Sequence, residues 1–321
     1  MIRLSYFLLL LFSTLNYSQT NISIGKNDKL VYLDSTSSET KSENYEYYRV
    51  IKDYYSDQEE YKFFVYYKNN QLKKESTLSA KDGGSSVGEE ISYYKNGNKQ
   101  NTKTYVSGRP TGKTKSWYEN GNVKEEGEYT GNYETPGKHY KLNQYWDENN
   151  NQVIIDGNGI YSSEINENYS ETGKYKDGFK DGIWEGKSIK DNTSFVEEYK
   201  ESKFLSGTRT FADNTKIVYF EMETKPVPKK GMQDFYNFIG KNFNYNKESI
   251  KNNIQGKIFL KFVVDKDGKI VEPKVLKGLG YGLDEEAIRV LLRYGDWIPG
   301  EQRGIKVRCS FSLPLSLQAG R

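Results

Sequence analysis

The sequence contains few side chains that could support catalysis or bind a metal. It has a single Cys, Cys309, and a single His, His139. A zinc site built from His and Cys needs several such ligands, so sites of this kind are excluded. A Ser-His-Asp triad could use only His139, and no Gly-x-Ser-x-Gly motif accompanies it. His139 lies in a polar stretch and is expected to be solvated, whereas the alternation around Cys309 predicts a small buried apolar residue.

Two short motifs partly match known ligand-binding loops. Gly278-Leu-Gly-Tyr-Gly282 has part of the spacing of a dinucleotide loop. That loop opens a helix directly after a buried parallel strand, however, and has its third Gly two positions further on. Asp265-Lys-Asp267-Gly268 lacks the later ligands and the bidentate Glu of a calcium loop. The sequence therefore predicts a strand-to-helix connection and a hairpin turn, with no cofactor and no metal.

The missing catalytic constellations predict that the protein is not an enzyme. The alternative is an enzyme that acts on cell-wall sugars through scattered carboxylates. No pair of Asp or Glu side chains stands out from the many acidic residues as an acid–base couple. Turnover of wall material by the purified protein would support this alternative.

The last stretch of the chain has the pattern of a small α+β domain. Two apolar runs flank Asp267-Gly268, a dipeptide that favours the φ > 0 of a tight hairpin turn. From Leu283 to Arg293 the apolar residues recur on one helical face. Alternating apolar and polar residues from Ile305 to Leu313 predict a strand with one buried face. This order predicts a ββαβ domain, whose buried face includes Leu260, Phe262, Leu291, Val307 and Phe311.

These residues resemble the C-terminal domain of TonB-type energy transducers. The resemblance covers roughly residues 232–317, and the predicted domain is 232–321. The family often has Tyr-Pro before the first strand, whereas here Tyr245 is followed by Asn246. The matching motifs are the opening Gly256–Gly268, Leu283-Asp-Glu-Glu-Ala287, Trp297-x-Pro299-Gly300 and the closing Val307–Pro314.

The resemblance implies that the terminal domain binds a protein segment. In the TonB family this domain captures a short segment of an outer-membrane transporter. An exposed edge strand can capture an extended peptide through main-chain hydrogen bonds. The alternation places the Arg308 side chain outward but leaves open whether its N–H faces the open edge or the neighbouring strand. The partner-binding edge strand would consist of Ile305, Lys306, Val307, Arg308, Cys309, Ser310 and Phe311.

Residues 58–222 contain a repeated pattern of short strands and turns. An aromatic-x-Asn/Glu-Gly/Asn turn recurs at spacings of 27, 24 and 28 residues. A period in this range marks a repeat architecture. One hairpin cannot bury its own apolar face, so the units must stack side by side. The copies are Tyr67-Lys-Asn-Asn70, Tyr94-Lys-Asn-Gly97, Tyr118-Glu-Asn-Gly121 and Trp146-Asp-Glu-Asn149, with Gly-x3-Gly motifs at Gly108–Gly112 and Gly178–Gly182.

This region resembles MORN-type β-hairpin repeats, in the diverged form common in bacterial antitoxin-like and secreted proteins. The resemblance implies a modular surface for contact with protein or lipid. The alternative is that the aromatic residues only hold the sheet together, since cross-strand aromatic pairs stabilise such sheets. The predicted fold class is mainly β, with a MORN-like hairpin sheet followed by the ββαβ terminal domain.

The N-terminal residues have the layout of a secretory signal peptide, predicted as 1–18. Arg3 precedes an apolar run over 6–12, and small or polar residues lead to a cleavage point after Ser18. The run is shorter than the roughly 20 apolar residues of a membrane span, although an uncleaved anchor is the alternative. Residues 19–57 form a polar lead-in, and Tyr61–Tyr67 is the first predicted strand.

A linker is predicted over 223–231, between the repeats and the terminal domain. Two prolines keep this segment extended and out of a helix. A helix over 234–243 follows, because its apolar residues are spaced for one helical face. Limited proteolysis is expected to release a stable fragment that starts near Lys229 or Lys230.

The charge distribution suggests the kind of partner. From Met232 onward Lys and Arg exceed Asp and Glu by five, so the rest of the chain is net negative. This excess is too small and too scattered for nucleic-acid binding and favours an acidic protein surface or peptide.

The sequence therefore predicts a periplasmic protein-binding module of the Gram-negative cell envelope. The module would be exported by its signal peptide and would contact an envelope protein or a transporter peptide segment. The alternative is a genuine energy transducer for outer-membrane transmembrane transport, with an uncleaved anchor that contacts the inner membrane. The linker is far too short to be the long Pro-rich spacer of a transducer.

Overall fold

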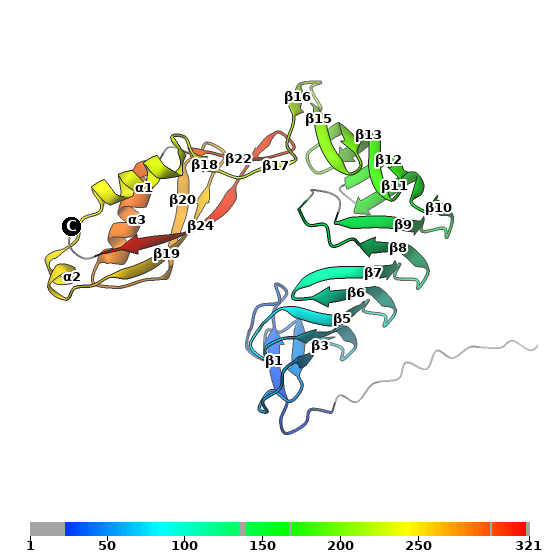
Figure 1. Cartoon of the computed structure of the whole chain (residues 1–321), viewed down its shortest axis with the longest axis horizontal. Helices are drawn as coiled ribbons and strands as arrows, with labels where there is room; N and C mark the ends of the chain where they lie inside the picture. Colours follow the sequence, from blue (N-terminus) through cyan, green and yellow to red (C-terminus); the bar gives the residue numbers. More distant parts are fainter. Residues whose placement is uncertain (1–22, 135–138, 167–168, 296, 319–321) are drawn as a thin grey trace, which may run out of the picture. The chain divides into compact units, whose positions relative to one another are not determined.

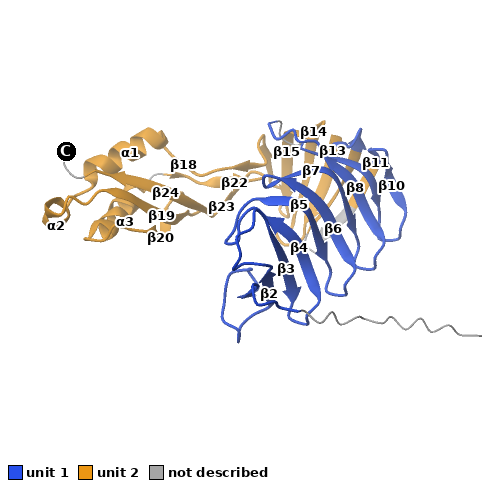
Figure 2. Cartoon of the chain, turned by 60° about the horizontal axis from the view of Figure 1, so that its bottom comes forward, with its two compact units in different colours: residues 1–159, 175–179 blue, residues 160–174, 180–321 orange. Residues whose placement is uncertain are grey.

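The computed structural model describes residues 23–134, 139–166, 169–295 and 297–318. The chain divides into two compact units, one ending at Gly159 but including Tyr175–Phe179, the other holding the remainder up to the C-terminus (Figure 2). The predicted signal peptide lies outside the described residues. Within the described ranges, no helix is long and apolar enough to cross a membrane.

Before the C-terminal domain, the described residues form one antiparallel sheet of sixteen strands whose order follows the chain (Figure 1). The predicted fold class, mainly β followed by an α+β domain, is confirmed. The strands are β1 Lys29–Leu33, β2 Tyr47–Ile51, β3 Tyr61–Tyr67, β4 Leu72–Leu78, β5 Ser86–Tyr93, β6 Lys99–Val106, β7 Arg109–Trp117, β8 Val123–Tyr129, β9 Tyr140–Trp146, β10 Gln152–Ile155, β11 Asn158–Asn166, β12 Tyr169–Lys176, β13 Phe179–Ser188, β14 Thr193–Lys200, β15 Lys203–Phe211 and β16 Lys216–Tyr219.

Two strands lie within the segment predicted to be a polar lead-in. The prediction that Tyr61–Tyr67 is the first strand is therefore wrong. β1 pairs with β2, and β2 pairs with β3. Val31, Leu33 and Val50 of these strands are buried. Both strands are five residues long, and their pairing with neighbours decides their conformation more than their own propensity does.

The repeated turns are three-residue hairpin loops that end in a left-handed residue. At Tyr94, for example, the Gly97 N–H donates to the Tyr94 carbonyl, and the Tyr94 N–H donates to the Asn98 carbonyl. Gly97 has a φ of 90°, a conformation that Gly and Asn tolerate best. The turn positions predicted at Tyr67, Tyr94 and Tyr118 are confirmed, with positive φ at Asn70, Gly97 and Gly121.

The fourth copy of the turn is shifted by one residue, and a further copy was missed. The shifted turn runs from Asp147 to Asn150, because the left-handed residue is the second of three consecutive asparagines. The missed copy runs from Phe211 to Asn214, where Asn214 has a φ of 65°. Asp213 stands in this copy where the sequence pattern has Asn or Glu, so the pattern did not reveal it.

The tyrosines that open these turns connect successive repeats by hydrogen bonds. The Tyr67 hydroxyl donates to the Tyr93 carbonyl, and the Tyr94 hydroxyl donates to the Trp117 carbonyl, both at 2.9 Å. The Tyr118 hydroxyl continues the series with the Trp146 carbonyl at 2.8 Å. Each acceptor is the residue that directly precedes a turn, so the aromatic residues fix the stacking of neighbouring units.

Tyr94→Phe is expected to lower the free energy of unfolding by about 0.5–1.5 kcal/mol, the net contribution of one hydrogen bond. The ring remains in place, so packing is unchanged. Denaturant unfolding of the purified chain measures the effect. Tyr55→Phe is the control, because its side chain is 68% exposed. Equal midpoints for the two variants would show that the series of hydrogen bonds does not stabilise the repeats.

The C-terminal domain has the predicted ββαβ order. Strands β19 (Gly256–Val264) and β20 (Ile270–Lys277) form a hairpin, and β24 (Cys309–Leu317) pairs on the other side of β19. In the hairpin turn, Asp265 Oδ1 accepts hydrogen bonds from the N–H groups of Asp267 and Lys269. The acidic motif therefore stabilises a turn, as predicted.

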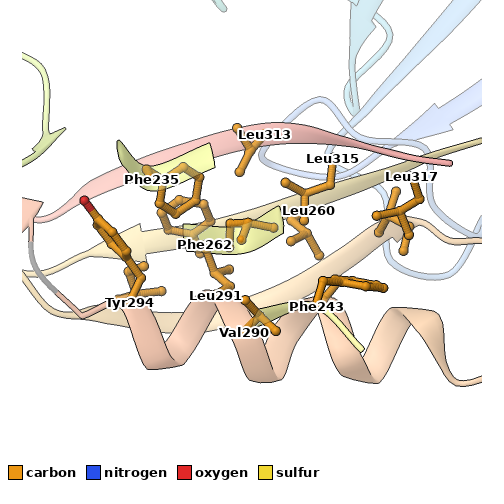
Figure 3. Packing of buried hydrophobic residues seen from close by; sticks show 14 of the residues in the cluster. Phe235, Phe243, Leu260, Phe262, Val290, Leu291, Tyr294, Leu313, Leu315 and Leu317 are labelled. Atoms are coloured by element: carbon orange, nitrogen blue, oxygen red, sulfur yellow. The ribbon is translucent and has the colours of Figure 1, made fainter. Parts of the chain in front are cut away.

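Helices α1 (Gly231–Asn242) and α3 (Leu283–Tyr294) pack over the inner face of this three-stranded sheet (Figure 1). The short helix α2 (Lys247–Lys251) lies between α1 and β19 in the chain. Figure 3 shows the leucines of β24 pointing toward Leu260, Phe262 and the α3 side chains. Leu260, Phe262 and Leu291 are fully buried as predicted, whereas Val307 and Phe311 are only half-buried.

The segment predicted to be a linker is extended, but it is paired with the C-terminal domain. β17 (Glu223–Thr224) pairs with β22 (Gly300–Gln302), and β18 (Val227–Pro228) pairs with β21 (Trp297–Ile298). β22 also forms a hairpin with β23 (Ile305–Val307). The segment is therefore part of the C-terminal domain rather than a free linker, because its backbone completes two small sheets.

Within the second unit, the tip of the β22–β23 hairpin contacts the last strands of the repeat sheet. Arg303, at the hairpin turn, places its Nε 2.7 Å from the Oε1 of Glu197. The Glu197 side chain is fully buried and accepts hydrogen bonds from the Tyr199 and Tyr219 hydroxyls. The Arg303 guanidinium also lies 4.3 Å from the ring centre of Phe195. This Arg303 contact joins residues 106 positions apart in the chain.

The surroundings of Glu197 keep its tyrosine neighbours protonated. Burial, and then the Glu197 carboxylate, raise the pKa of the Tyr199 and Tyr219 hydroxyls above their usual range. Both hydroxyls therefore remain hydrogen-bond donors at neutral pH. Together with Arg303 they satisfy a carboxylate that has no access to water.

Candidate functional site

The seven residues predicted as a partner-binding edge lie in two consecutive strands. Ile305–Val307 form β23 and pair with β22, whereas Cys309 onward forms β24 and pairs with β19. Arg308 lies between the two strands. The predicted single strand is therefore divided, because the chain passes from one sheet to another at Arg308. β23 and β24 are both edge strands of their sheets in the described ranges.

The predicted alternation continues through both strands to Leu317. Odd-numbered residues from Ile305 onward are half-buried or buried, and even-numbered residues are exposed. Cys309 is half-buried rather than fully buried, because it lies at the start of β24, away from the leucines that cover the core. Its thiol lies 3.8 Å from the Val307 carbonyl.

A proline shows which main-chain groups of β24 point to the open edge. Pro314 has no N–H and lies opposite Phe259 of β19 in the paired register. A paired strand tolerates proline where the missing donor would face away from the partner. This direction alternates from residue to residue in an antiparallel ladder. The N–H and carbonyl groups of Ser310 and Ser312 therefore point to the open edge, and those of Leu313 point to β19.

The open edge has a defined extent. Ser310 and Ser312 each direct an N–H and a carbonyl to this edge, whereas Pro314 directs only a carbonyl. An added strand would therefore find its best partners between Cys309 and Leu313. The sequence left the direction of the Arg308 N–H open; in the structure Arg308 lies between two strands, and the direction at Ser310 follows from the position of Pro314.

The two basic residues of the candidate edge, Lys306 and Arg308, differ in their environment. Arg308 forms an exposed ion pair with Glu272 of β20 at 2.5 Å. Its charge is thus partly neutralised within the domain. Lys306 is exposed on β23. Arg308 would therefore contribute less than Lys306 to attracting an acidic segment.

The other residues with possible chemistry have structural environments. His139 is exposed, and its ring lies 6.2 Å from that of Tyr133. Gly280 and Gly282 have φ values of 70° and 74° and lead the chain into α3, as predicted. Across the residues that the structure describes, no group of three His, Cys, Asp or Glu side chains could hold a metal ion.

Residues 241–316 match the family model described as Gram-negative bacterial TonB protein C-terminal. The match covers β19, β20, α3 and nearly all of β24, so the terminal ββαβ unit is a TonB-type C-terminal domain and the resemblance is confirmed. No curated protein matches the chain significantly. The family match begins after the repeats, and their likeness to MORN repeats stays a prediction. A domain of this family indicates a protein-interacting role in the envelope rather than catalysis.

Proposed function

We propose that this protein is an exported, periplasmic binding module that captures an extended segment of an outer-membrane transporter at β24. The observation that supports the proposal best is the open edge of β24 in a TonB-type domain. Main-chain groups of Ser310 and Ser312 would pair with the incoming segment. The repeat sheet would provide a second contact surface.

Strand addition suits the chemistry of this edge. Backbone hydrogen bonds supply affinity without requiring particular side chains, and the rigid β19–β24 pair holds the edge strand ready. The buried side chains of Leu313 and Leu315 fix β24 against the core. Binding therefore needs little reordering of the domain.

The family match also supports a second candidate function, a genuine energy transducer with an uncleaved N-terminal anchor. The two functions differ in the fate of residues 1–18. N-terminal sequencing of the protein isolated from the envelope separates them. A mature chain that starts after Ser18 would contradict the transducer, and a retained N-terminus in the inner-membrane fraction would contradict the exported module.

Ser310→Pro is expected to weaken capture of transporter segments about fivefold. The substitution removes an N–H that faces the open edge, and one such hydrogen bond contributes about 1 kcal/mol. It leaves the pairing with β19 intact, because Pro314 shows that prolines are compatible with this side of the strand. Pull-down of outer-membrane transporter segments by the full chain provides the measurement.

Ser310→Ala is the matched control, because it removes the hydroxyl and keeps the backbone donor. Ser312→Pro repeats the test at the next outward-facing position. Circular dichroism confirms that each variant is folded. Capture by folded Ser310→Pro and Ser312→Pro at the level of Ser310→Ala would rule out strand addition at this edge.

A further inference from the structure

The solvent-facing side of the C-terminal sheet carries a row of lysines. The Cα register places Ser312 of β24 opposite Lys261 of β19, and Lys261 opposite Lys274 of β20. Lys257 and Lys277 lie on the same two strands and, like Lys261 and Lys274, are exposed. We refer to Lys257, Lys261, Lys274 and Lys277 as the basic face.

The basic face is not balanced by acidic residues of its own sheet. β19, β20 and β24 contain one acidic residue, Glu272, and it pairs with Arg308. None of the four lysines forms an ion pair with a residue in the described ranges. Like charges directly opposite each other on neighbouring strands destabilise a sheet. Repulsion between Lys261 and Lys274 therefore lowers the stability of the free domain, and an anionic partner would relieve this repulsion.

The position of the basic face links it to the β24 edge. A strand added to β24 would lie two strand spacings, roughly 10 Å, from β19. The outward side chains between them, Ser310 and Ser312, are small. The long stem of Lys261 can therefore extend over Ser312 toward a side chain of the added strand. A Glu or Asp side chain reaching back from that strand would meet the ammonium group.

We propose that the segment captured at β24 is acidic, with carboxylate side chains at alternate positions that face the Lys261–Lys274 row. This inference rests on the proposed capture at β24 and adds the chemical class of the partner. Main-chain hydrogen bonds to β24 position the segment, and the lysines of the basic face favour segments with acidic side chains. Exposed Phe259, between Lys257 and Lys261, would pack against the apolar part of the segment's acidic side chains.

Synthetic peptides with capped ends test the selection on the full chain. The probes are an alternating Glu-Val decapeptide, its Gln-Val counterpart and its Lys-Val counterpart. We expect the Glu-Val peptide to bind about tenfold more tightly than the Gln-Val peptide at low salt. The preference should shrink at high salt, where charges on an exposed surface are screened. The Lys-Val peptide should bind most weakly.

The double variant Lys261→Gln/Lys274→Gln should abolish the preference for Glu over Gln. Its matched control is Lys247→Gln/Lys251→Gln on α2, which removes the same charge from two exposed lysines elsewhere in the domain. Equal affinity of the Glu-Val and Gln-Val peptides would overturn the inference while leaving strand capture intact. So would an equal loss of preference in the two double variants. If no peptide binds, or if Ser310→Pro leaves peptide binding unchanged, capture at β24 fails as well.

Discussion

Leu291→Ala is expected to lower the free energy of unfolding of the C-terminal domain by about 2–5 kcal/mol, the usual range for a buried leucine. Leu291 is completely buried in the core of this domain, where α3 faces Leu260 and Phe262 of β19 (Figure 3). The substitution removes apolar contacts and leaves a cavity that the tightly packed aromatic neighbours cannot fill.

Leu292→Ala is a control from the next position of the same helix. The Leu292 side chain is 45% exposed, so its loss should change the free energy by less than about 0.5 kcal/mol. Hydrogen exchange of α3 and β19 amides in the intact chain reports the stability of this domain separately from the repeats. Similar exchange rates in the two variants would mean that α3 does not pack through the face defined by Leu291.

The elements that local patterns determine were predicted from the sequence. The α3 face repeats at helical spacing, and Leu283, Ala287 and Val290 are all buried as the pattern requires. The turn at Gly268 follows from its dipeptide, and its φ is 79°. These features depend on residues a few positions apart, so the sequence alone contains the information.

The features that were missed depend on contacts between distant residues. β17 and β18 become strands because Gly300–Gln302 and Trp297–Ile298 pair with them, some 75 residues away in the chain. The two prolines predict an extended backbone but not its partner. The division of the candidate edge at Arg308 has the same origin, since the alternation of side chains is unbroken there. The boundary between the two strands is set by their different pairing partners, β22 for β23 and β19 for β24, and not by the side-chain pattern.

Pairing across the sheet also revealed the basic face. Lys261 and Lys274 are separated by a hairpin turn in the sequence and become neighbours only through the register of β19 with β20. The sequence indicated a mild excess of positive charge in the domain but not its position. The register shows that the charge is concentrated beside the strand edge where a partner would bind.

Arg303→Ala is expected to destabilise the docked state of the β22–β23 hairpin by about 3–5 kcal/mol, because it leaves the buried Glu197 without its cationic partner. Movement of the hairpin away from the repeat sheet would expose the unpaired Glu197 carboxylate to water and so relieve the destabilisation. β17 pairs with β22 of that hairpin. Movement of the hairpin away from Glu197 should therefore loosen Glu223–Thr224 and the residues after it. We therefore expect limited proteolysis to cut near Lys229 in the variant much faster than in the wild type.

Two further variants separate the buried charge from the loss of a side chain. Arg308→Ala removes an arginine from the exposed pair with Glu272, an interaction contributing at most about 1 kcal/mol, and should leave the cleavage rate unchanged. Arg303→Met combined with Glu197→Gln removes both charges while keeping side-chain volume, and should restore much of the protection. Arg303→Ala that is cut no faster than Arg308→Ala would show that the Arg303 contact does not hold the hairpin. Loss of protection in Arg303→Ala, with recovery in the double variant, would support the uncompensated charge of buried Glu197 as the cause, because the double variant removes that charge.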